Sequence, residues 1–261
     1  MWLSICIRIV SKKTKPKANK LPKRRNMLQI KNLEKSYQAG VKAVDDLSLS
    51  VKSGEIYGFV GHNGAGKSTT IKAIVGALGF DKGEILIDGK SIREDPIGAK
   101  QVLAYIPDNP DLYEHLTGIQ YINFVCDIYG VGEIRNQLIS RYAEDFQIQD
   151  NLGDLISSYS HGMKQKLVLI SALVHSPKLL VLDEPFVGLD PVASFRLKEI
   201  MKELCSKGSS IFFSSHVLEV VEKLCDRVGI IKKGKLVLEG TMEEIAGEKS
   251  LEKLFLEIAD E

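Results

Sequence analysis

A nine-residue stretch rich in glycine has the residue types and spacing needed to bind a chain of phosphates. Residues 61–69 read Gly-His-Asn-Gly-Ala-Gly-Lys-Ser-Thr and fit the pattern G-x-x-x-x-G-K-[ST]. Glycines let the backbone curl so that successive N–H groups face one anion, and the amino end of a following helix adds positive charge. We expect Lys67 to reach the β- and γ-phosphates and Ser68 to offer its hydroxyl to Mg²⁺. The residues expected to contact the phosphates are Gly61, His62, Asn63, Gly64, Ala65, Gly66, Lys67, Ser68 and Thr69.

The segments on either side of this loop have the patterns of a strand and a helix, which is the context that the motif requires. Residues 55–60 form a short apolar run typical of a buried strand. Residues 70–78 place Ile71, Ile74 and Leu78 on one face at helical spacing. The alternative, a glycine-rich turn that contains a lysine by chance, does not account for these flanks.

Two acidic residues follow a second apolar run. Residues 179–182 read Leu-Leu-Val-Leu and lead directly into Asp183 and Glu184. Ligands of open α/β sheets bind at the carboxyl ends of the strands. We therefore expect Asp183 to support the Mg²⁺ held by Ser68, and Glu184 to polarise a water that attacks the γ-phosphate. The alternative is a solvated Asp-Glu turn before Pro185.

A histidine follows a third apolar run. Residues 211–216 read Ile-Phe-Phe-Ser-Ser-His, and we expect the strand at 211–213 to neighbour the strand that ends at Asp183. His216 would then be placed to hydrogen-bond a γ-phosphate or to orient the attacking water. The alternative is a histidine that caps the strand or lies on the surface.

The rest of the chain alternates between strand-like and helix-like patterns, which predicts an α/β fold. The first third is expected to be mostly β, with strands near residues 28–30, 47–51 and 84–87. Helical spacing prevails from about 92 to 158, with a capping box at Thr117, a stop at Gly130 and a second helix at 133–146. Further helices are expected at 191–207 and 217–224, a hairpin at 228–238, and a terminal helix that begins with a capping box at Thr241.

The composition is that of a globular protein. The chain has 261 residues, of which 44% are hydrophobic and 26% charged, and no run approaches the roughly 20 apolar residues of a membrane span. The four cysteines lack the spacing of a metal site and are expected to be reduced thiols. Residues 1–26 hold nine of the 35 basic residues and no Asp or Glu, so the remaining chain is acidic despite the net charge of +1.

Three interpretations of residues 1–26 stay open. The basic part is rich in Lys and Pro and is expected to be disordered. The segment could be a translated upstream stretch with Met27 as the true start, a membrane-surface anchor in which apolar residues precede basic ones, or a nucleic-acid-binding tail. The abrupt start of the ordered pattern at Met27 favours the first interpretation.

These elements occur in the order and spacing of an ATP-binding cassette, so the chain resembles the nucleotide-binding subunits of ABC transporters over residues 27 to about 240. Residues 61–69 match the Walker A motif, and residues 179–184 match Walker B with its catalytic glutamate. Residues 159–165 resemble the signature motif, residues 188–190 the D-loop, and His216 the switch histidine. Tyr37 stands where the family stacks an aromatic ring on adenine; a strand tyrosine in a small core is the alternative for this residue.

The resemblance implies an α/β fold: an ABC-type P-loop ATPase core with an antiparallel β subdomain and an inserted helical subdomain. The cassette would span residues 27–240, with the helical subdomain at about 92–176. Residues 1–26 would form the basic extension and residues 241–261 a C-terminal helix.

The resemblance also implies ATP hydrolysis with ATP and Mg²⁺ bound, in which Lys67, Glu184 and His216 have catalytic roles. Two cassettes of this family close head to tail, and the signature of one completes the phosphate site of the other. Carried over, Ser160 and Gly162 would contact the nucleotide of a partner, and Asp190 would belong to the same site. From the residues alone, Ser160 is a helix N-cap, and the two roles are compatible.

Two motifs depart from the family pattern. His161 and Met163 replace the usual glycine and glutamine of the signature. Asp108 stands where the family usually has the glutamine of the Q-loop; its carboxylate could still ligate Mg²⁺ or order water. Together with the Tyr-Ser-x-Gly-Met-Lys-Gln signature, this acidic residue resembles the ATPases of ABC-2-type bacterial exporters.

The function expected from the resemblance is that of the ATPase subunit of an ABC transporter. Its partners would be membrane-spanning permease subunits and a second cassette, which would place it peripherally at the cytoplasmic face of the cell membrane, with no nucleic acid bound. A non-transport ABC ATPase acting on nucleic acid or ribosomes is the alternative, for which the basic segment is the one favourable feature. A regulatory nucleotide-binding module without turnover is disfavoured by Glu184 and His216.

Overall fold

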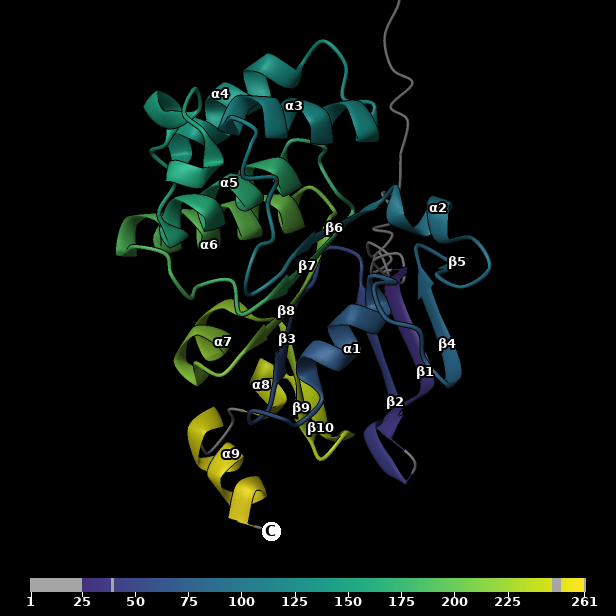
Figure 1. Cartoon of the computed structure of the whole chain (residues 1–261). Helices are drawn as coiled ribbons and strands as arrows, with labels where there is room; N and C mark the ends of the chain where they lie inside the picture. The colour runs from purple at the N-terminus through teal and green to yellow at the C-terminus, as the bar shows by residue number, and fades with distance from the viewer. Residues whose placement is uncertain (1–24, 39, 246–249, 261) are drawn as a thin grey trace, which may run out of the picture.

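The computed structural model describes residues 25–38, 40–245 and 250–260 and contains two β-sheets (Figure 1). The smaller sheet is antiparallel, with the order β2-β1-β4-β5. The larger sheet has the order β10-β9-β3-β8-β7-β6, and β10 is its one antiparallel strand among the described residues. The strands are β1 (Asn26–Gln38), β2 (Val41–Lys52), β3 (Ile56–Val60), β4 (Lys82–Ile87), β5 (Lys90–Ser91), β6 (Leu103–Ile106), β7 (Leu179–Asp183), β8 (Ser210–Ser215), β9 (Arg227–Lys232) and β10 (Lys235–Thr241).

The larger sheet is buried on both faces, because its alternate side chains enter two different cores. Tyr57 and Phe59 of β3 pack with helix α1 (Lys67–Ile74) and the antiparallel sheet. Ile56 and Val60 of the same strand pack on the opposite side, in a core that the helices complete. The molecule therefore has three layers: the antiparallel sheet with α1, the larger sheet, and the helices on its other side. This arrangement confirms the predicted α/β core with an antiparallel β subdomain.

The helices on the other side of the larger sheet come mostly from the region predicted to be helical (Figure 1). They are α3 (Gly118–Tyr129), α4 (Arg135–Asp145), α5 (His161–Leu173), α6 (Pro191–Ser206) and α7 (Leu218–Leu224). The capping box at Thr117 is confirmed, with the Gln120 amide donating to the Thr117 hydroxyl and the Thr117 amide to the Gln120 side chain. Gly130 ends α3 at a φ of 67°, as predicted, because this left-handed conformation suits glycine.

Several boundaries differ from the sequence prediction. Helix α1 begins at Lys67 and ends at Ile74, so Leu78 lies beyond it and Gly76, at a φ of 65°, follows the last turn. Strand β6 was not predicted; it lies inside the range 92–176 assigned to the helical subdomain, and it pairs with β7 in the larger sheet. The short helix α2 (Pro96–Lys100) precedes it.

The two ends of the chain were also predicted incompletely. Strand β1 already begins at Asn26, one residue before Met27. The predicted disorder and the three interpretations of the basic extension concern mainly residues 1–24, which lie outside the described part of the chain. The capping box at Thr241 is confirmed by bonds of 2.8 and 3.2 Å with Glu244. It starts the four-residue helix α8 (Met242–Ile245), and a separate helix, α9 (Leu251–Asp260), follows.

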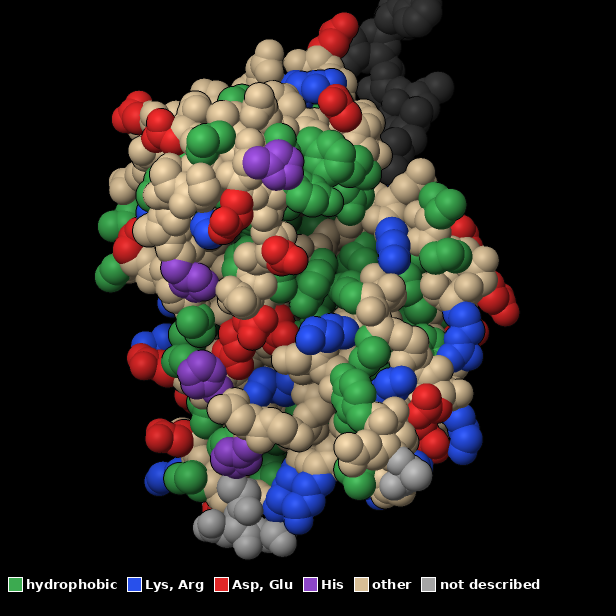
Figure 2. All heavy atoms as spheres, viewed as in Figure 1, with side chains coloured by type: hydrophobic (Ala, Val, Ile, Leu, Met, Phe, Trp, Pro, Cys, Tyr) green, Lys and Arg blue, Asp and Glu red, His purple; other side chains and the backbone are tan. Residues whose placement is uncertain are grey.

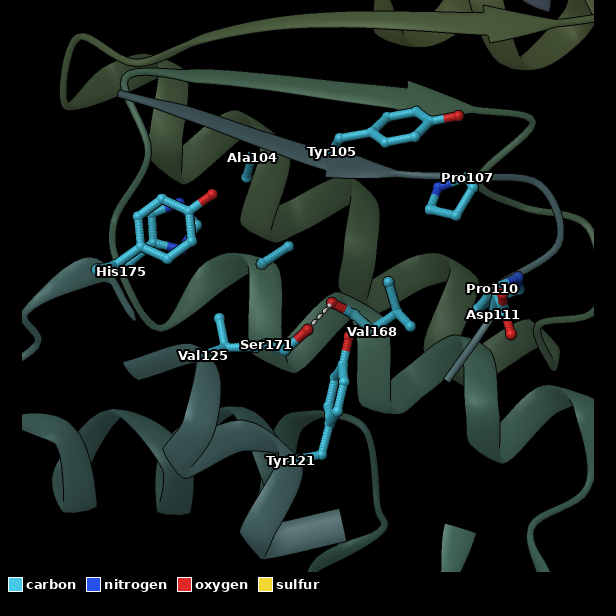
Figure 3. A pocket seen from close by; sticks show the side chains of 12 residues that line it. Ala104, Tyr105, Pro107, Pro110, Asp111, Tyr121, Val125, Val168, Ser171 and His175 are labelled. Atoms are coloured by element: carbon cyan, nitrogen blue, oxygen red, sulfur yellow. Dashed lines mark hydrogen bonds between the residues drawn. The ribbon is translucent and has the colours of Figure 1, made fainter. Parts of the chain in front are cut away.

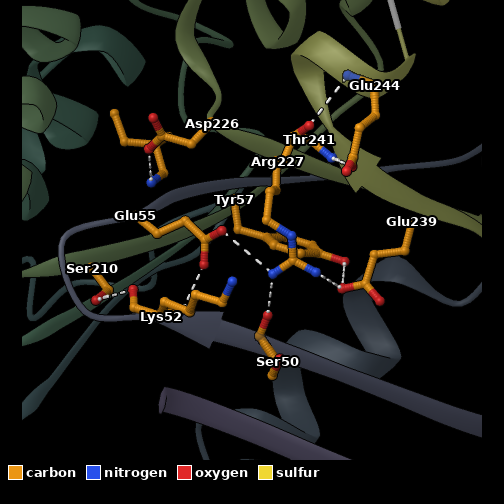
Figure 4. A network of polar contacts seen from close by, with 11 residues as sticks. Ser50, Lys52, Glu55, Tyr57, Ser210, Asp226, Arg227, Glu239, Thr241 and Glu244 are labelled. Atoms are coloured by element: carbon orange, nitrogen blue, oxygen red, sulfur yellow. Dashed lines mark hydrogen bonds and ion pairs between the residues drawn. The ribbon is translucent and has the colours of Figure 1, made fainter. Parts of the chain in front are cut away.

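A polar network holds the amino end of β3 against its neighbours (Figure 4). The Arg227 guanidinium donates to the Ser50 carbonyl at 2.9 Å and to the carboxylates of Glu55 at 3.4 Å and Glu239 at 2.7 Å. Burial, together with Glu239, raises the pKa of the Tyr57 phenol well above its usual value, and this hydroxyl donates to Glu239. Buried charges are tolerated when they are paired in this way. The network fixes one end of β3, while the loop at the other end builds the site.

Candidate nucleotide site

The predicted chemical residues meet at the carboxyl-end edge of the larger sheet. Because β8 lies between β3 and β7, the segments that follow these three strands are neighbours, as the sequence predicted for β7 and β8. A cleft of about 400 Å³ opens at this edge. Its lining residues are Tyr37, Ala43, His62, Asn63, Gly64, Gly66, Lys67, Ser68, Thr69, Asp108 and Glu184.

The glycine-rich loop has the geometry expected of a phosphate cradle. Gly66 forms the N-cap of α1 at a φ of 112°, and a Cβ atom there would lie 2.5 Å from the Ala43 carbonyl oxygen. Neither the conformation nor the close backbone contact is compatible with a larger residue. Lys67 is buried at 7% exposure, and its ammonium donates to the Gly61 carbonyl at 2.6 Å and the His62 carbonyl at 3.4 Å. The carbonyl groups of the loop therefore hold the Lys67 side chain in place at the amino end of α1.

Oxygen ligands suitable for Mg²⁺ surround the start of α1. Ser68 lines the cleft in the first turn of α1, which packs against β7, the strand that ends at Asp183. Asp183 is 2% exposed, and its Oδ1 atom accepts a bond of 2.5 Å from the Ser214 hydroxyl. Asp108 adds a second carboxylate at the cleft. A hydroxyl and one or two carboxylates that leave room for phosphate oxygens fit the ligand preference of Mg²⁺.

Glu184 lies between a lysine and a histidine. One carboxylate oxygen, Oε1, is 3.9 Å from the Lys67 ammonium, and the other, Oε2, is 2.9 Å from Nδ1 of His216. An ionised carboxylate only accepts hydrogen bonds, so Nδ1 carries the proton in this pair. The backbone of Glu184 has a φ of 50°, which is uncommon for a residue with a side chain. Its amide donates to Ser214 Oγ at 3.0 Å, which supports this conformation.

Tyr37 lies at the rim of the cleft. Its side chain is 62% exposed, and its hydroxyl is 3.3 Å from the Thr69 hydroxyl. The ring is therefore not part of a small core, which was the alternative interpretation. An exposed ring beside the phosphate loop is available to stack on a base.

The signature residues form a second group, apart from the cleft. Ser160 caps α5 by accepting a bond of 3.3 Å from the Met163 amide, as predicted. Asp190 caps α6 through the Ala193 amide, and the Lys166 ammonium at 2.6 Å holds the pKa of its carboxyl below the usual value. A Cβ atom on Gly162 would lie 3.0 Å from the Gly188 carbonyl oxygen, so the signature and the D-loop touch. Ser160, Gly162 and Asp190 do not line the cleft.

Two further residues, Ser214 and Ala43, contribute to the site and were not predicted from the sequence. Ser214 bridges the two acids, since its hydroxyl donates to Asp183 and accepts from the Glu184 amide. A serine at the carboxyl end of an apolar strand was the available signal. Ala43 comes from β2, and its place at the cleft follows only from the packing of the two sheets.

The fold and this cleft define a P-loop nucleotide-binding protein. The sequence profile of the family described as ABC transporter matches residues 44–187. The chain belongs to this family, and it is an ATP-binding ATPase. In the part of the chain that the structure describes, no helix combines the length and hydrophobicity that a membrane crossing requires.

Several relatives match most of the chain. The ABC-type transporter ATP-binding protein EcsA of Bacillus subtilis is 34% identical over 90% of this chain and 98% of its own length. The linearmycin resistance ATP-binding protein LnrL of the same organism is 38% identical over 84% of this chain and 70% of its own length. A solved structure of the ATP-binding subunit of an ABC transporter superposes with a TM-score of 0.86 at 34% identity, covering 89% of this chain and 99% of that one.

Proposed function

We propose that the chain is the ATP-hydrolysing subunit of an ABC transporter, and that it drives separate membrane-spanning subunits by closing and opening a head-to-tail dimer. The observation that carries the proposal is the separation of two half-sites. The phosphate loop, Asp183, Glu184 and His216 lie at one edge of the sheet, whereas Ser160 and Gly162 lie outside the cleft. A second copy could bring its signature to this cleft.

ATP binding is assigned to the loop and the residues around it. The backbone N–H groups of residues 61–69 and the amino end of α1 would hold the phosphates, with Lys67 on the β- and γ-phosphates and Tyr37 under the adenine. Ser68, Asp183 and Asp108 would hold Mg²⁺. When bound, the ion would neutralise charge on the phosphate oxygens.

Hydrolysis is assigned to Glu184 and His216. The Glu184 carboxylate would accept the proton of a water that attacks the γ-phosphorus, which is general-base catalysis. The hydrogen bond of 2.9 Å from His216 Nδ1 orients this carboxylate. It leaves Nε2 of His216 free to face the γ-phosphate or the water, and positioning of this kind supplies most of the catalysis in phosphoryl transfer.

An exposed apolar patch next to the D-loop supports contact with a second copy. Val187, Val192 and Phe195 flank Asp190 and are 46%, 55% and 65% exposed. Exposed large apolar side chains that lie close together in the chain are available for an interaction surface. In the proposed dimer, the patch would pack while Ser160 and the amino end of α5 reach the partner's γ-phosphate.

An aromatic patch on the helical region supports a membrane-spanning partner. Its members Tyr113, Phe124, Ile128 and Tyr129 are 53%, 45%, 63% and 37% exposed, and Figure 2 shows hydrophobic side chains gathered over α3. The rings of Tyr113 and Phe124 meet edge to face at 5.9 Å. We assign this patch as the anchor for the permease, because aromatic side chains are enriched among the residues that carry most of the binding energy of protein interfaces.

The pocket beside the aromatic patch gives the partner a place to insert (Figure 3). It measures about 240 Å³ and lies between β6, α3 and α5, with Tyr121, Val168 and His175 among its walls. Pro107 and Asp111, which stand on either side of Asp108 in the segment that joins β6 to α3, form another wall. A segment of the partner inserted here would touch the backbone next to Asp108, which lines the nucleotide cleft. The pocket and the cleft would then be coupled through this short stretch of backbone.

The proposal places the chain at the cytoplasmic face of the cell membrane, held there by its partner. The similarity to the linearmycin resistance ATP-binding protein LnrL supports a role in export. The alternative of an ABC ATPase acting on nucleic acid or ribosomes rests on the basic residues of the segment 1–26, and nearly all of that segment lies outside the described residues.

Glu184→Gln tests the proposal. The variant should bind ATP as the wild type does, accumulate as a dimer in the presence of ATP and Mg²⁺, and hydrolyse about 10²- to 10⁴-fold more slowly, the usual contribution of general-base catalysis. The measurements are phosphate release, ATP binding, and mass by light scattering. Wild-type phosphate release in Glu184→Gln would contradict the assigned role of this residue.

A further inference from the structure

Helix α9 lies outside the range matched by the family profile, yet it is anchored in the main core. Leu251 in its first turn is completely buried, and Phe255 and Ile258 pack partly buried against the same core. The Ile258 carbonyl oxygen accepts a bond of 2.5 Å from the Lys232 ammonium of β9. Ser250 caps the helix through the Lys253 amide. These contacts fix the position of α9 on the molecule.

This position brings Phe255 onto the phosphate loop. The ring of Phe255 lies against the imidazole of His62, with ring centroids 4.5 Å apart and planes inclined by 42°. A small cavity of about 230 Å³ separates α9 from the loop, and its walls are Gly61, His62, Asn63, His216 and Phe255. Phe255 is thus the wall residue that α9 supplies to this cavity, and the other wall residues belong to the nucleotide site.

The backbone of His62 takes part in the hydrogen bonds that shape the phosphate loop. Its carbonyl oxygen accepts bonds from the Ala65 amide at 3.1 Å and from the Lys67 ammonium at 3.4 Å. The side chain is exposed and lines the cleft. A contact that restrains the His62 ring therefore also restrains the carbonyl that faces Lys67.

We propose that Phe255 is a positioning residue for ATP binding, which acts by holding His62 and so the first turn of the phosphate loop. The inference rests on the proposed assignment of residues 61–69 to ATP binding. Preorganisation of a binding loop lowers the entropy lost when the ligand binds. The effect of Phe255 accordingly falls on the affinity for ATP, and hydrolysis at saturating ATP is unaffected.

The test is a double-variant cycle in the full chain, with ATP dissociation constants measured for the wild type, Phe255→Ala, His62→Ala and the combined variant. Phe255→Ala should raise the dissociation constant about 2- to 10-fold, the range for loss of one aromatic contact, and KM in parallel with unchanged kcat. In the His62→Ala background, Phe255→Ala should have no further effect. Equal effects in both backgrounds would overturn the proposal, because Phe255 would then not act through His62.

Two more variants separate the ring contact from simple packing. Phe255→Leu keeps an apolar side chain but removes the ring, and should weaken ATP binding like alanine; Phe255→Tyr keeps the ring and should bind as the wild type does. Full affinity in Phe255→Leu would reduce Phe255 to a packing residue. Leu256→Ala, on the exposed side of the same helix at 55% exposure, is the matched control and should change nothing. Failure of the wild type to bind ATP would instead contradict the proposed function.

Discussion

The Glu184 carboxylate and the His216 imidazole are joined by a hydrogen bond of 2.9 Å, although they follow different strands. Strands β7 and β8 are adjacent and parallel, so their carboxyl ends place the two residues at one point. The same oxygen of Glu184 also accepts the His216 backbone amide at 3.3 Å. The carboxylate is thus oriented by two donors of one residue, and its other oxygen faces Lys67. This arrangement places the Glu184 carboxylate, the proposed general base, beside the lysine of the phosphate loop.

Replacement of that lysine should weaken nucleotide binding. Lys67→Ala removes the buried ammonium assigned to the β- and γ-phosphates, and we expect the affinity for ATP to fall about 10- to 100-fold, as for loss of a hydrogen bond to a charged group. The measurement is equilibrium binding of ATP by calorimetry. Lys72→Ala is the control, since Lys72 is exposed on the same helix, away from the cleft. Equal affinities of Lys67→Ala and wild type would remove Lys67 from the phosphate site.

His175 should make folding stability depend on pH. Burial lowers the pKa of this imidazole below 6.5, and the ring stacks on Tyr129 with centroids 3.8 Å apart. Between the lowered pKa and 6.5, the unfolded chain binds more protons at this site than the folded chain, so stability falls as the pH drops through that window. The measurement is urea unfolding from pH 7.5 to 5.

His175→Phe keeps a stacking ring but cannot be protonated. The free energy of unfolding of this variant should decline less than that of the wild type over the same pH range. Identical pH profiles would mean that burial of His175 has no energetic consequence.

A charge in the aromatic patch should release the chain from its membrane partner. Phe124→Asp places a carboxylate on an interface that we propose to be apolar, and desolvation of an unpaired charge is costly. We expect the fraction of chain that sediments with native membranes to fall several-fold, while ATP hydrolysis by the isolated chain is unchanged. Ile97→Asp, at a position that is 75% exposed on α2, serves as the control for surface charge. Sedimentation of Phe124→Asp with membranes like the wild type would contradict the assignment of the patch.

The phosphate loop, the strand ends and the capping boxes could be predicted because each depends on local residue types. Strand β6 was missed because a four-residue apolar run cannot be told from a helix by its spacing alone. The start of α1 was placed too late because Lys67 was considered only as a ligand, although it also opens the helix. Contacts such as Phe255 on His62 join distant parts of the chain and have no signal in a single sequence.

In the proposed dimer, each ATPase site is made by the phosphate loop of one chain and the signature of the other. Complementation between Lys67→Ala and Ser160→Arg is the decisive test of this arrangement. Each variant alone is defective in every site, because the first disables the loop and the second blocks the signature. In a mixed head-to-tail dimer, one site combines the intact loop of the Ser160→Arg chain with the intact signature of the Lys67→Ala chain. We expect ATP hydrolysis to return when the two variants are mixed; a mixture as inactive as its components would exclude a site shared between two chains.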